Sequence, residues 1–307
     1  MGWTSADIGD LSGLTVVVTG ANSGLGFEAT KQLVLHGARV VAGCRNLDRG
    51  QVCLALPGPG KVDLRQLDLA DLGSITDFAA GVVADYPMLD IQLNNAGVMA
   101  IPRAETADGF EMQFGTNHLG HFALTGRLLP ALLAAPAARV VTVSSGMHKV
   151  GRMNFEDLMG TRRYQRWQAY SQSKLANLLF TYELQARLAG AAAAAIAVAA
   201  HPGYAATNLQ SGHARATGRG LEERIMSITN KIVAQSAADG ALPELYAGTA
   251  PGVQGGDYFG PGGLFESRGA PTLVQPTAAA KDPVAAARLW AESERLTGVT
   301  FSELDQV

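Results

Sequence analysis

The chain has 307 residues, of which 47% are hydrophobic and 17% charged, so it contains enough apolar material for one large core. Its formal net charge of −3 argues against a nucleic-acid partner, because such partners normally require a basic surface. The two cysteines, Cys44 and Cys53, lack the spacing of a zinc site or a disulfide framework.

Short apolar runs alternate along the chain with longer segments of helical pattern. The runs predict buried strands at 14–19, 39–43, 62–67, 90–93, 139–144 and 194–200. The longer segments predict helices at 24–36, 72–85, 109–133 and 167–188. Strands that alternate with helices in this way pair in parallel, so we expect an α/β fold with a doubly wound parallel sheet.

The C-terminal part shows a less regular pattern. Residues 248–271 are rich in glycine and proline and predict a surface loop that wraps the domain. One further helix is predicted at 283–296, which is too little for a second core. We therefore predict a single domain over residues 1–307. The polar start of the chain, and apolar runs shorter than the roughly 20 residues of a membrane span, predict a cytoplasmic protein with no signal peptide.

A glycine-rich turn follows the first predicted strand, with the sequence Thr-Gly-Ala-Asn-Ser-Gly-Leu-Gly at residues 19–26. Glycines let the backbone turn tightly and approach a pyrophosphate, and the next helix offers its N-terminal amides to that charge. Alone, this pattern also fits an ordinary turn between a strand and a helix. Its position between a buried strand and an amphipathic helix favours a dinucleotide-binding loop.

Tyr170 and Lys174 are four residues apart on a predicted helix, so their side chains share one face. A free tyrosine has a pKa of about 10, which is too high for acid–base work near neutrality. A neighbouring ammonium, together with an oxidised nicotinamide, would lower that pKa. Tyr170 could then exchange a proton with a carbonyl oxygen. Most such pairs are solvated helix faces, so this interpretation depends on the surrounding motifs.

Polar residues mark the ends of neighbouring strands, where a doubly wound sheet binds its ligands. These are Asn94-Asn95-Ala96-Gly97, Ser144-Ser145 and His201-Pro202-Gly203, with Asn117 in the adjacent helix. The motifs occur in the order found in short-chain dehydrogenases/reductases, and the chain resembles that family over residues 12–210. The resemblance implies a Rossmann fold and hydride transfer between a nicotinamide cofactor and the carbonyl or alcohol carbon of a small molecule.

The resemblance also implies roles for individual residues. Tyr170 would be the acid/base, and Lys174 would hold the nicotinamide ribose and lower the pKa of the tyrosine. Ser145 would hydrogen-bond the substrate oxygen, and Asn117 would hold a water that links Lys174 to solvent. Tyr170 and Lys174 would also contact the cofactor. The other residues of the cofactor site would be Gly20, Asn22, Ser23, Gly24, Leu25, Gly26, Asp68, Leu69, Asn95, Ala96, Gly97, Pro202, Gly203 and Thr207.

Two features resemble the retinol dehydrogenase and WW-domain oxidoreductase branch of that family. Ser145 and Tyr170 are 25 residues apart, with Asn-Phe-Glu-Asp-Leu at 154–158 between them, and the tail contains Tyr-Phe-Gly-Pro at 258–261. In the family the segment after Thr207 forms a substrate lid, which predicts a lid at about 208–240 and a C-terminal wrap at 241–307. Apolar residues recur at helical spacing in that lid between Leu221 and Val233, so we expect a lipophilic substrate.

The end of the second predicted strand bears on cofactor choice. An acidic residue there would accept hydrogen bonds from the ribose 2′-hydroxyl of NAD, whereas arginine pairs with the 2′-phosphate of NADP. The sequence has Arg45 at this point, and the first acidic residue, Asp48, lies three positions further on. We therefore expect a preference for NADP(H). The glycine loop has Asn22 and Ser23 where a second basic residue often stands, so NAD(H) also remains possible.

Other readings remain open at this stage. A carbon–carbon double-bond reductase that uses NADP(H), or a nucleotide-sensing protein without activity, would share the fold; the complete Ser–Tyr–Lys–Asn set favours an enzyme. His118 and His121 are three residues apart but have no third metal ligand at suitable spacing, so we predict structural roles. Helices 109–133 and 167–188 resemble those that pair subunits in the family. They predict a homodimer or homotetramer unless the C-terminal segment covers them.

Overall fold

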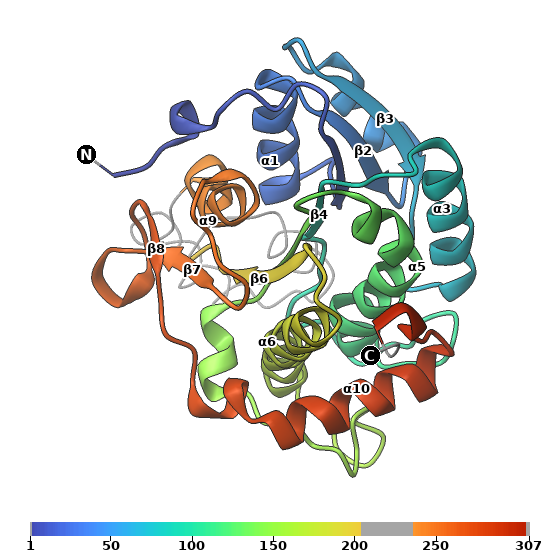
Figure 1. Cartoon of the computed structure of the whole chain (residues 1–307). Coiled ribbons are helices and arrows are strands. Elements are labelled where there is room, and N and C mark those ends of the chain that lie inside the picture. The colour runs from blue at the N-terminus through green and yellow to red at the C-terminus, as the bar shows by residue number, and fades with distance from the viewer. Residues whose placement is uncertain (1, 204–235, 305–307) are drawn as a thin grey trace, which may run out of the picture.

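The computed structural model describes residues 2–203 and 236–304, which form a central sheet with helices on both faces (Figure 1). Within these residues the sheet has eight strands in the order β3-β2-β1-β4-β5-β6-β7-β8. The strands are β1 Thr15–Thr19, β2 Arg39–Cys44, β3 Lys61–Gln66, β4 Ile91–Asn94, β5 Arg139–Val143, β6 Ile196–Ala200, β7 Tyr258–Pro261 and β8 Pro271–Leu273. β7 and β8 are antiparallel and the other neighbours are parallel. The order reverses between β1 and β4, where doubly wound sheets bind ligands.

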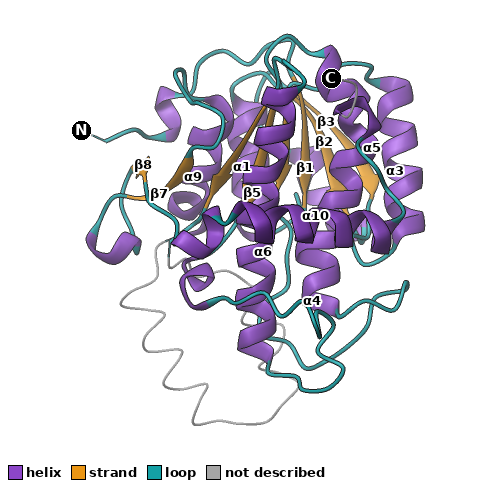
Figure 2. Ribbon diagram, turned by 60° about the horizontal axis from the view of Figure 1, so that its bottom comes forward, coloured by secondary structure: helices purple, strands orange, loops and turns teal. Residues whose placement is uncertain are grey.

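The helices form a layer on each side of the sheet (Figures 1 and 2). One face is covered by α1 Gly24–Leu35 and α9 Ala237–Thr249, which pack against each other. The other face is covered by α3 Leu72–Asp85, α5 Gly120–Ala134 and α6 Arg166–Gly190, with α10 Pro283–Thr297 outside α6. Among the described residues, no helix is both long and apolar enough to cross a membrane. Short helical segments join these elements: η1 Ser5–Asp7, α2 Leu47–Gly50, η2 Gln51–Ala55, α4 Met112–Phe114, η3 Gly115–Leu119, η4 Gly146–Val150, η5 Leu264–Glu266, η6 Ala278–Lys281 and η7 Ser302–Leu304.

Alternation along the buried strands divides the core between the two faces. Val17 of β1 packs with the α3 and α5 side, whereas Val16 and Val18 pack with the α1 and α9 side. Each buried valine contributes about 1.5–3 kcal/mol relative to an exposed one. This burial explains why most of the first six strands appear in the sequence as largely apolar runs, whereas β3 contains charged residues and is only half-buried. The structure confirms all six predicted strands to within about two residues at each end.

Capping residues fix the helix ends. Asp71 accepts hydrogen bonds from the amides of Gly73 (2.8 Å) and Ser74 (3.2 Å) at the start of α3. Asp282 does the same at the start of α10, and Gly298, with φ of 66°, ends that helix in the left-handed conformation. Side-chain caps of this kind satisfy amides that have no partner within the helix.

The prediction of a surface loop over residues 248–271 is wrong in part. Tyr258–Pro261 form β7, and Tyr258 and Phe259 are only 2% and 3% exposed. The strand is four residues long and lies among glycines, so its own pattern is too short to distinguish it from a loop. Residues 237–240, at the end of the predicted lid, form the start of α9, which Ser236 caps. The rest of the lid, with Leu221 to Val233, lies outside the described residues.

The C-terminal segment covers the helices that resemble subunit-pairing helices. Trp290 of α10 stacks on Phe180 of α6, with ring centres 6.0 Å apart, and meets Phe122 of α5 edge-on at 5.1 Å. Phe301 packs against the same tryptophan at 4.5 Å. The predicted helix at 109–133 is divided into α4, the π-helical turn η3 and α5.

Candidate active site

The glycine-rich turn is so tight at its glycines that a side chain there would be strained or would meet a neighbouring residue. Gly20 and Gly24 have φ of 67° and 55°, the left-handed region that glycine adopts most easily. A Cβ at Gly26 would lie 2.5 Å from the carbonyl oxygen of Gly20, and one at Gly20 would lie 3.1 Å from Cβ of Ala96. The side chain of Ser23 makes no capping bond to α1. The backbone of the turn and the N-terminus of α1 therefore leave room for a pyrophosphate, and the predicted binding of a dinucleotide there stays a prediction.

Thr19, at the end of β1, connects this turn to the end of β4. Its Oγ1 accepts hydrogen bonds from the amides of Asn95 (3.0 Å) and Ala96 (2.9 Å), and Nδ2 of Asn95 donates to the carbonyl of Thr19 (2.8 Å). Nε2 of His121 also lies 2.9 Å from Oγ1 of Thr19. His118 contacts Oγ of Ser293 at 2.9 Å. Burial lowers the pKa of His118 to about 3 and that of His121 to about 4, so both rings are neutral parts of the framework.

Tyr170 lies in the second turn of α6 and is 7% exposed. Burial raises the pKa of its phenol, and a hydrogen bond with Ser145 acts in the opposite direction. Nζ of Lys174 lies 5.9 Å from the ring centre. The lowering of this pKa by Lys174 together with an oxidised nicotinamide stays a prediction. Ser145 is itself held in place, since its Oγ accepts a hydrogen bond from the amide of Met147 (3.2 Å).

Lys174 is also buried, with 4% of its surface exposed. Its Nζ donates to the carbonyl of Val143 at the end of β5 (3.0 Å), and Nδ2 of Asn177 donates to the same oxygen (3.0 Å). Burial lowers the pKa of Lys174 to about 8, and the charge of Glu244 partly counteracts this. The lysine is thus fixed at the carboxyl edge of the sheet beside Tyr170.

Asn117 lies in the π-helical turn η3, an irregularity that is common at functional sites. Its Oδ1 accepts from the amide of Val98 (2.8 Å), while Nδ2 donates to the carbonyl of Val98 (2.9 Å) and to Oγ of Ser173 (2.9 Å). A Cβ at Gly97 would lie 3.0 Å from Oδ1 of Asn117 and 3.6 Å from Nζ of Lys174. The asparagine therefore joins the loop after β4 to α6 and brings Gly97 and Lys174 together.

The other predicted cofactor residues lie along the same edge of the sheet. Arg45 is exposed directly after β2, and Asp48 lies on α2. Oδ1 of Asp68 accepts from the amide of Ala70 (2.9 Å), and Leu69 is buried. Pro202 and Gly203 follow β6, and Thr207 lies outside the described residues.

Sequence reasoning missed several residues around this edge. The thiol of Cys53 donates to the carbonyl of Ala21 in the glycine loop (3.3 Å), and a hydrogen bond between Cys44 and Cys53 raises the pKa of Cys44. Glu244 on α9 is 2% exposed, its carboxyl oxygens have no hydrogen-bond partner, and burial raises its pKa to about 8. A buried glutamate in an alanine-rich helix has no distinguishing sequence pattern.

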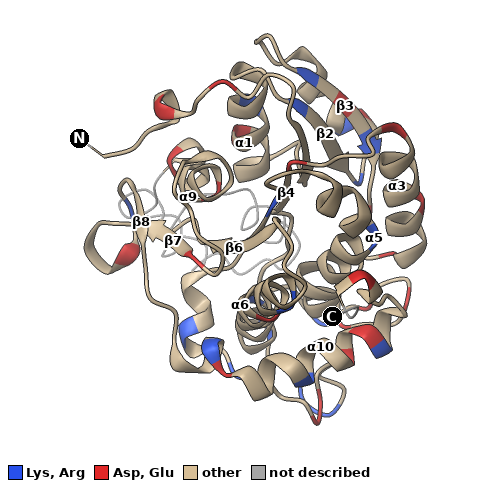
Figure 3. Ribbon diagram, viewed as in Figure 1, with Lys and Arg blue, Asp and Glu red and all other residues tan. Residues whose placement is uncertain are grey.

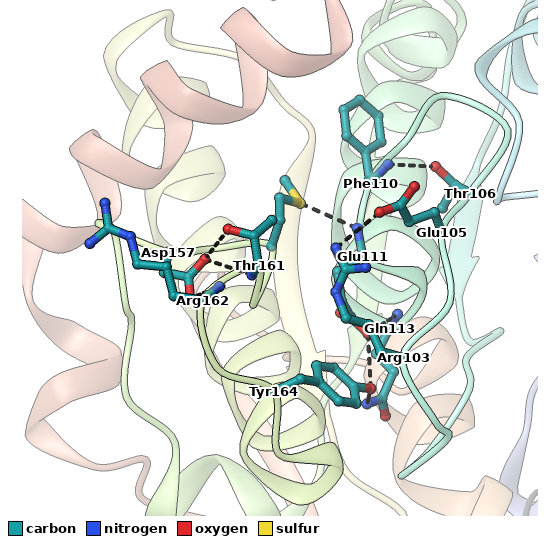
Figure 4. A network of polar contacts seen from close by, with 11 residues as sticks. Arg103, Glu105, Thr106, Phe110, Glu111, Gln113, Asp157, Thr161, Arg162 and Tyr164 are labelled. Carbon is teal, nitrogen blue, oxygen red and sulfur yellow. Dashed lines mark hydrogen bonds and ion pairs between the residues drawn. The ribbon is translucent and has the colours of Figure 1, made fainter.

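The segment between Ser145 and Tyr170 is anchored on α4 through the polar network of Figure 4. The hydroxyl of Tyr164 donates to Oε1 of Glu111 (3.1 Å), and Glu111 caps α4 through the amides of Gln113 and Phe114. Burial raises the pKa of Glu111. A polar cavity of about 440 Å³ lies between this segment and α6, and includes Glu111, Arg152, Asp157, Tyr164 and Gln168 in its lining. Figure 3 shows that acidic and basic residues are interspersed along the helices and loops of the chain.

A model of the short chain dehydrogenase family matches residues 14–217. Mouse retinol dehydrogenase 14 is 38% identical over 314 residues, covering 95% of this chain and 88% of its own length. Human retinol dehydrogenase 12 is 40% identical over 297 residues, with the same two shares. An uncharacterised protein from Mycobacterium paratuberculosis has a similar solved structure, with a TM-score of 0.82, 44% identity and coverage of 98% of this chain and 99% of its own. The chain therefore belongs to the short-chain dehydrogenase family, in the branch that contains these retinol dehydrogenases.

Proposed function

We propose that this oxidoreductase is an NADP(H)-dependent carbonyl reductase or alcohol dehydrogenase that acts on a lipophilic aldehyde, ketone or alcohol. The observation that carries the proposal is the placement of Tyr170, Ser145 and Lys174 together at the carboxyl edge of the sheet: Nζ of Lys174 lies 5.9 Å from the ring centre of Tyr170, and the hydroxyl of Ser145 lowers the pKa of that tyrosine. Two hydroxyls that face each other in a buried site can both hydrogen-bond one substrate oxygen.

In the direction of reduction, a nicotinamide cofactor bound at this edge would supply the hydride that the substrate carbon receives. Tyr170 donates its phenolic proton to the substrate oxygen, while Ser145 keeps that oxygen in place. The raised pKa of Tyr170 keeps the phenol protonated at neutral pH, which suits an acid. The ammonium of Lys174 stabilises the phenolate left behind, and it acts strongly because both groups are buried away from water. The same residues operate in reverse when an alcohol is oxidised.

The choice of a lipophilic substrate is supported by the names of the relatives and by the sequence. Retinol, the alcohol in those names, is a long apolar molecule. The apolar residues between Leu221 and Val233 follow the strand end at Pro202 and Gly203, where the family has its lid. An apolar lid favours long substrates, since each buried methylene contributes about 0.8 kcal/mol.

The choice of NADP(H) is supported by Arg45. It is exposed at the carboxyl end of β2, where a guanidinium can reach a ribose 2′-phosphate. A structure described as an NAD(P)-dependent gluconate 5-dehydrogenase from Beutenbergia cavernae, 25% identical and with a TM-score of 0.62, was solved with bound NADP. It covers 81% of this chain and 95% of its own.

The test is a panel of aldehydes, ketones, enones and alcohols graded in chain length, assayed with NADPH and NADP⁺ by nicotinamide absorbance. We expect turnover of aldehydes or ketones whose kcat/KM rises with chain length, and turnover lowered by orders of magnitude in Tyr170→Phe. Reduction of enones without alcohol formation would instead identify a double-bond reductase. Cofactor binding without turnover of any member would indicate a nucleotide sensor.

A further inference from the structure

A second group of buried polar side chains lies beside these residues, and the reaction as proposed does not use it. It consists of His148 in η4, His201 after β6 and Tyr258 in β7, and Glu266 in η5 adjoins it. The ring centre of Tyr258 lies 5.6 Å from that of His148 and 5.3 Å from that of His201. Each of the three rings is at most 2% exposed.

The carboxylate of Glu266 connects two segments of the active site. Its Oε2 lies 2.9 Å from Nζ of Lys149 and 3.2 Å from Nε2 of His201. Lys149 belongs to η4, which begins directly after Ser145, and His201 is followed by Pro202 and Gly203. These contacts hold the pKa of Glu266 down at about 2, so its carboxylate is ionised at physiological pH. One charge thus links the serine segment to the segment proposed to lie beside the nicotinamide.

The hydrogen bonds of His201 show which of its ring nitrogens carries the proton in the neutral ring. The amide of Gly203 donates to Nδ1 of His201 (3.2 Å), so Nδ1 carries no proton. In the neutral ring the proton is therefore on Nε2, which faces Glu266. Nε2 has no hydrogen bond of good geometry, so its contact with Glu266 is mainly electrostatic. Gly260 makes room for the ring, since a Cβ there would lie 2.6 Å from Cδ2 of His201.

The backbone around Glu266 is in an unfavourable conformation. Phe265 and Glu266 both have φ of 54°, a region that residues other than glycine rarely adopt. Such geometry persists where surrounding contacts hold it. The turn lies directly on Gly203: a Cβ at Gly203 would lie 2.6 Å from the carbonyl oxygen of Ser267 and 3.0 Å from that of Glu266. The side chain of Glu266 therefore contacts His201, and its backbone packs against Gly203, two residues further along the chain.

We infer that Glu266 is a positioning residue that holds segments 145–149 and 201–203 at a fixed spacing through Lys149 and His201. It acts on the reaction only through these two segments. Without its charge the strained turn is free to relax, and the backbone of Gly203 and the hydroxyl of Ser145 lose their alignment. Small displacements of reacting groups reduce turnover strongly, so the effect appears mainly in kcat. The inference rests on the proposed function, because its kinetic test measures the reduction of a carbonyl substrate.

The experiment compares Glu266→Gln with Glu156→Gln as a matched control. Both changes remove a carboxylate that forms a 2.9 Å ion pair between segments distant in sequence, since Glu156 pairs with Arg288 on α10. We expect Glu266→Gln to lower kcat about tenfold with little change in KM, and to weaken NADPH binding about threefold. Glu156→Gln should change neither quantity. The readouts are steady-state kinetics at 15 °C and titration of NADPH fluorescence, with the thermal midpoint of each variant.

A second variant, Lys149→Met, removes one of the two contacts and keeps the alkyl chain. Its loss should be smaller than that of Glu266→Gln, and the double variant should be no worse than Glu266→Gln alone, because both changes break one interaction. Wild-type kcat and cofactor affinity in Glu266→Gln would overturn the inference. A fall in kcat no larger than the unfolded fraction of the variant accounts for would also overturn the inference. If the wild-type protein reduces no carbonyl, the proposed function fails, and the NADPH titration still decides the role of Glu266.

Discussion

Glu244 on α9 and Lys174 on α6 approach the sheet from opposite faces, and each acts on the charge of the other. Both are buried, with 2% and 4% of their surfaces exposed. Burial raises the pKa of Glu244 to about 8 and lowers that of Lys174 to about 8, and their mutual attraction opposes both shifts. A carboxyl on a helix far from Tyr170 in sequence therefore influences the lysine that supports it.

The first prediction concerns stability. The folded-state pKa of Glu244, about 8, lies above the ordinary value of 4.5, so its favourable contribution is complete below pH 4.5 and is lost as pH rises to 8. Glu244→Gln removes this dependence. The thermal midpoint of the variant minus that of the wild type should therefore be larger at pH 8.5 than at pH 5, by about 2 °C or more. Calorimetry at both pH values checks this, with Glu156→Gln as control; equal differences at the two values would contradict it.

The second prediction concerns the pH dependence of activity. Lys174 must be protonated to stabilise the phenolate, so kcat should fall as pH rises through about 8. In Glu244→Gln the attraction that raises the pKa of Lys174 is missing, and the fall should begin at a pH lower by about half a unit or more. A pH profile of kcat for both proteins measures the shift. An identical alkaline limb would show that the two charges do not interact.

The third prediction concerns Tyr170. Tyr170→Phe removes the proton donor and leaves a ring of nearly the same shape in the buried site, so kcat should fall by about 10²–10⁴-fold. NADPH affinity should change little, because the hydroxyl acts on the substrate. Turnover and fluorescence titration of one preparation separate the two effects, and near-wild-type turnover would exclude Tyr170 as the acid.

The fourth prediction concerns Arg45. A charge-assisted hydrogen bond to the 2′-phosphate should make NADPH bind roughly 10- to 150-fold more tightly than NADH. Arg45→Asp should reverse this order, because it removes the contact and adds repulsion. Arg162→Asp, the same charge change in an exposed loop, should leave the order unchanged. Titration of both cofactors decides the matter: tighter NADH binding by the wild-type protein refutes the assignment.

The fifth prediction concerns Trp290. Its ring contacts Phe122, Phe180 and Phe301, and Arg187 lies 4.4 Å from its centre. Trp290→Ala should lower the free energy of unfolding by about 3–5 kcal/mol. Val284→Ala on the same helix, where the side chain is 77% exposed, should stay within about 0.5 kcal/mol of wild type. Urea unfolding measures both, and equal small effects would show that α10 contributes little.

Local signals predicted much of the fold and of the site. Most of the first six strands are largely apolar runs. The motifs around Gly20, Asn95, Ser145 and Tyr170 lie at strand ends or helix starts, so the fold brings them to one edge of the sheet. Contacts between distant segments were not predictable in this way. Glu266 meets Lys149 across 117 residues, and only the folded chain shows this pairing. The strand β7 was also not predictable from its own four residues, because they form a strand by pairing with the free edge of β6.

The aromatic contacts of α10 have a consequence for the order in which the chain is made. Phe122 and Phe180 are synthesised long before Trp290 and Phe301, which cover them. While the chain leaves the ribosome, the outer surface of α5 and α6 is therefore apolar and exposed to solvent. Exposed apolar surface of this kind promotes association between nascent chains. A truncation that removes residues from 283 onward would make this exposure permanent, so a shortened chain should require a chaperone to remain dispersed.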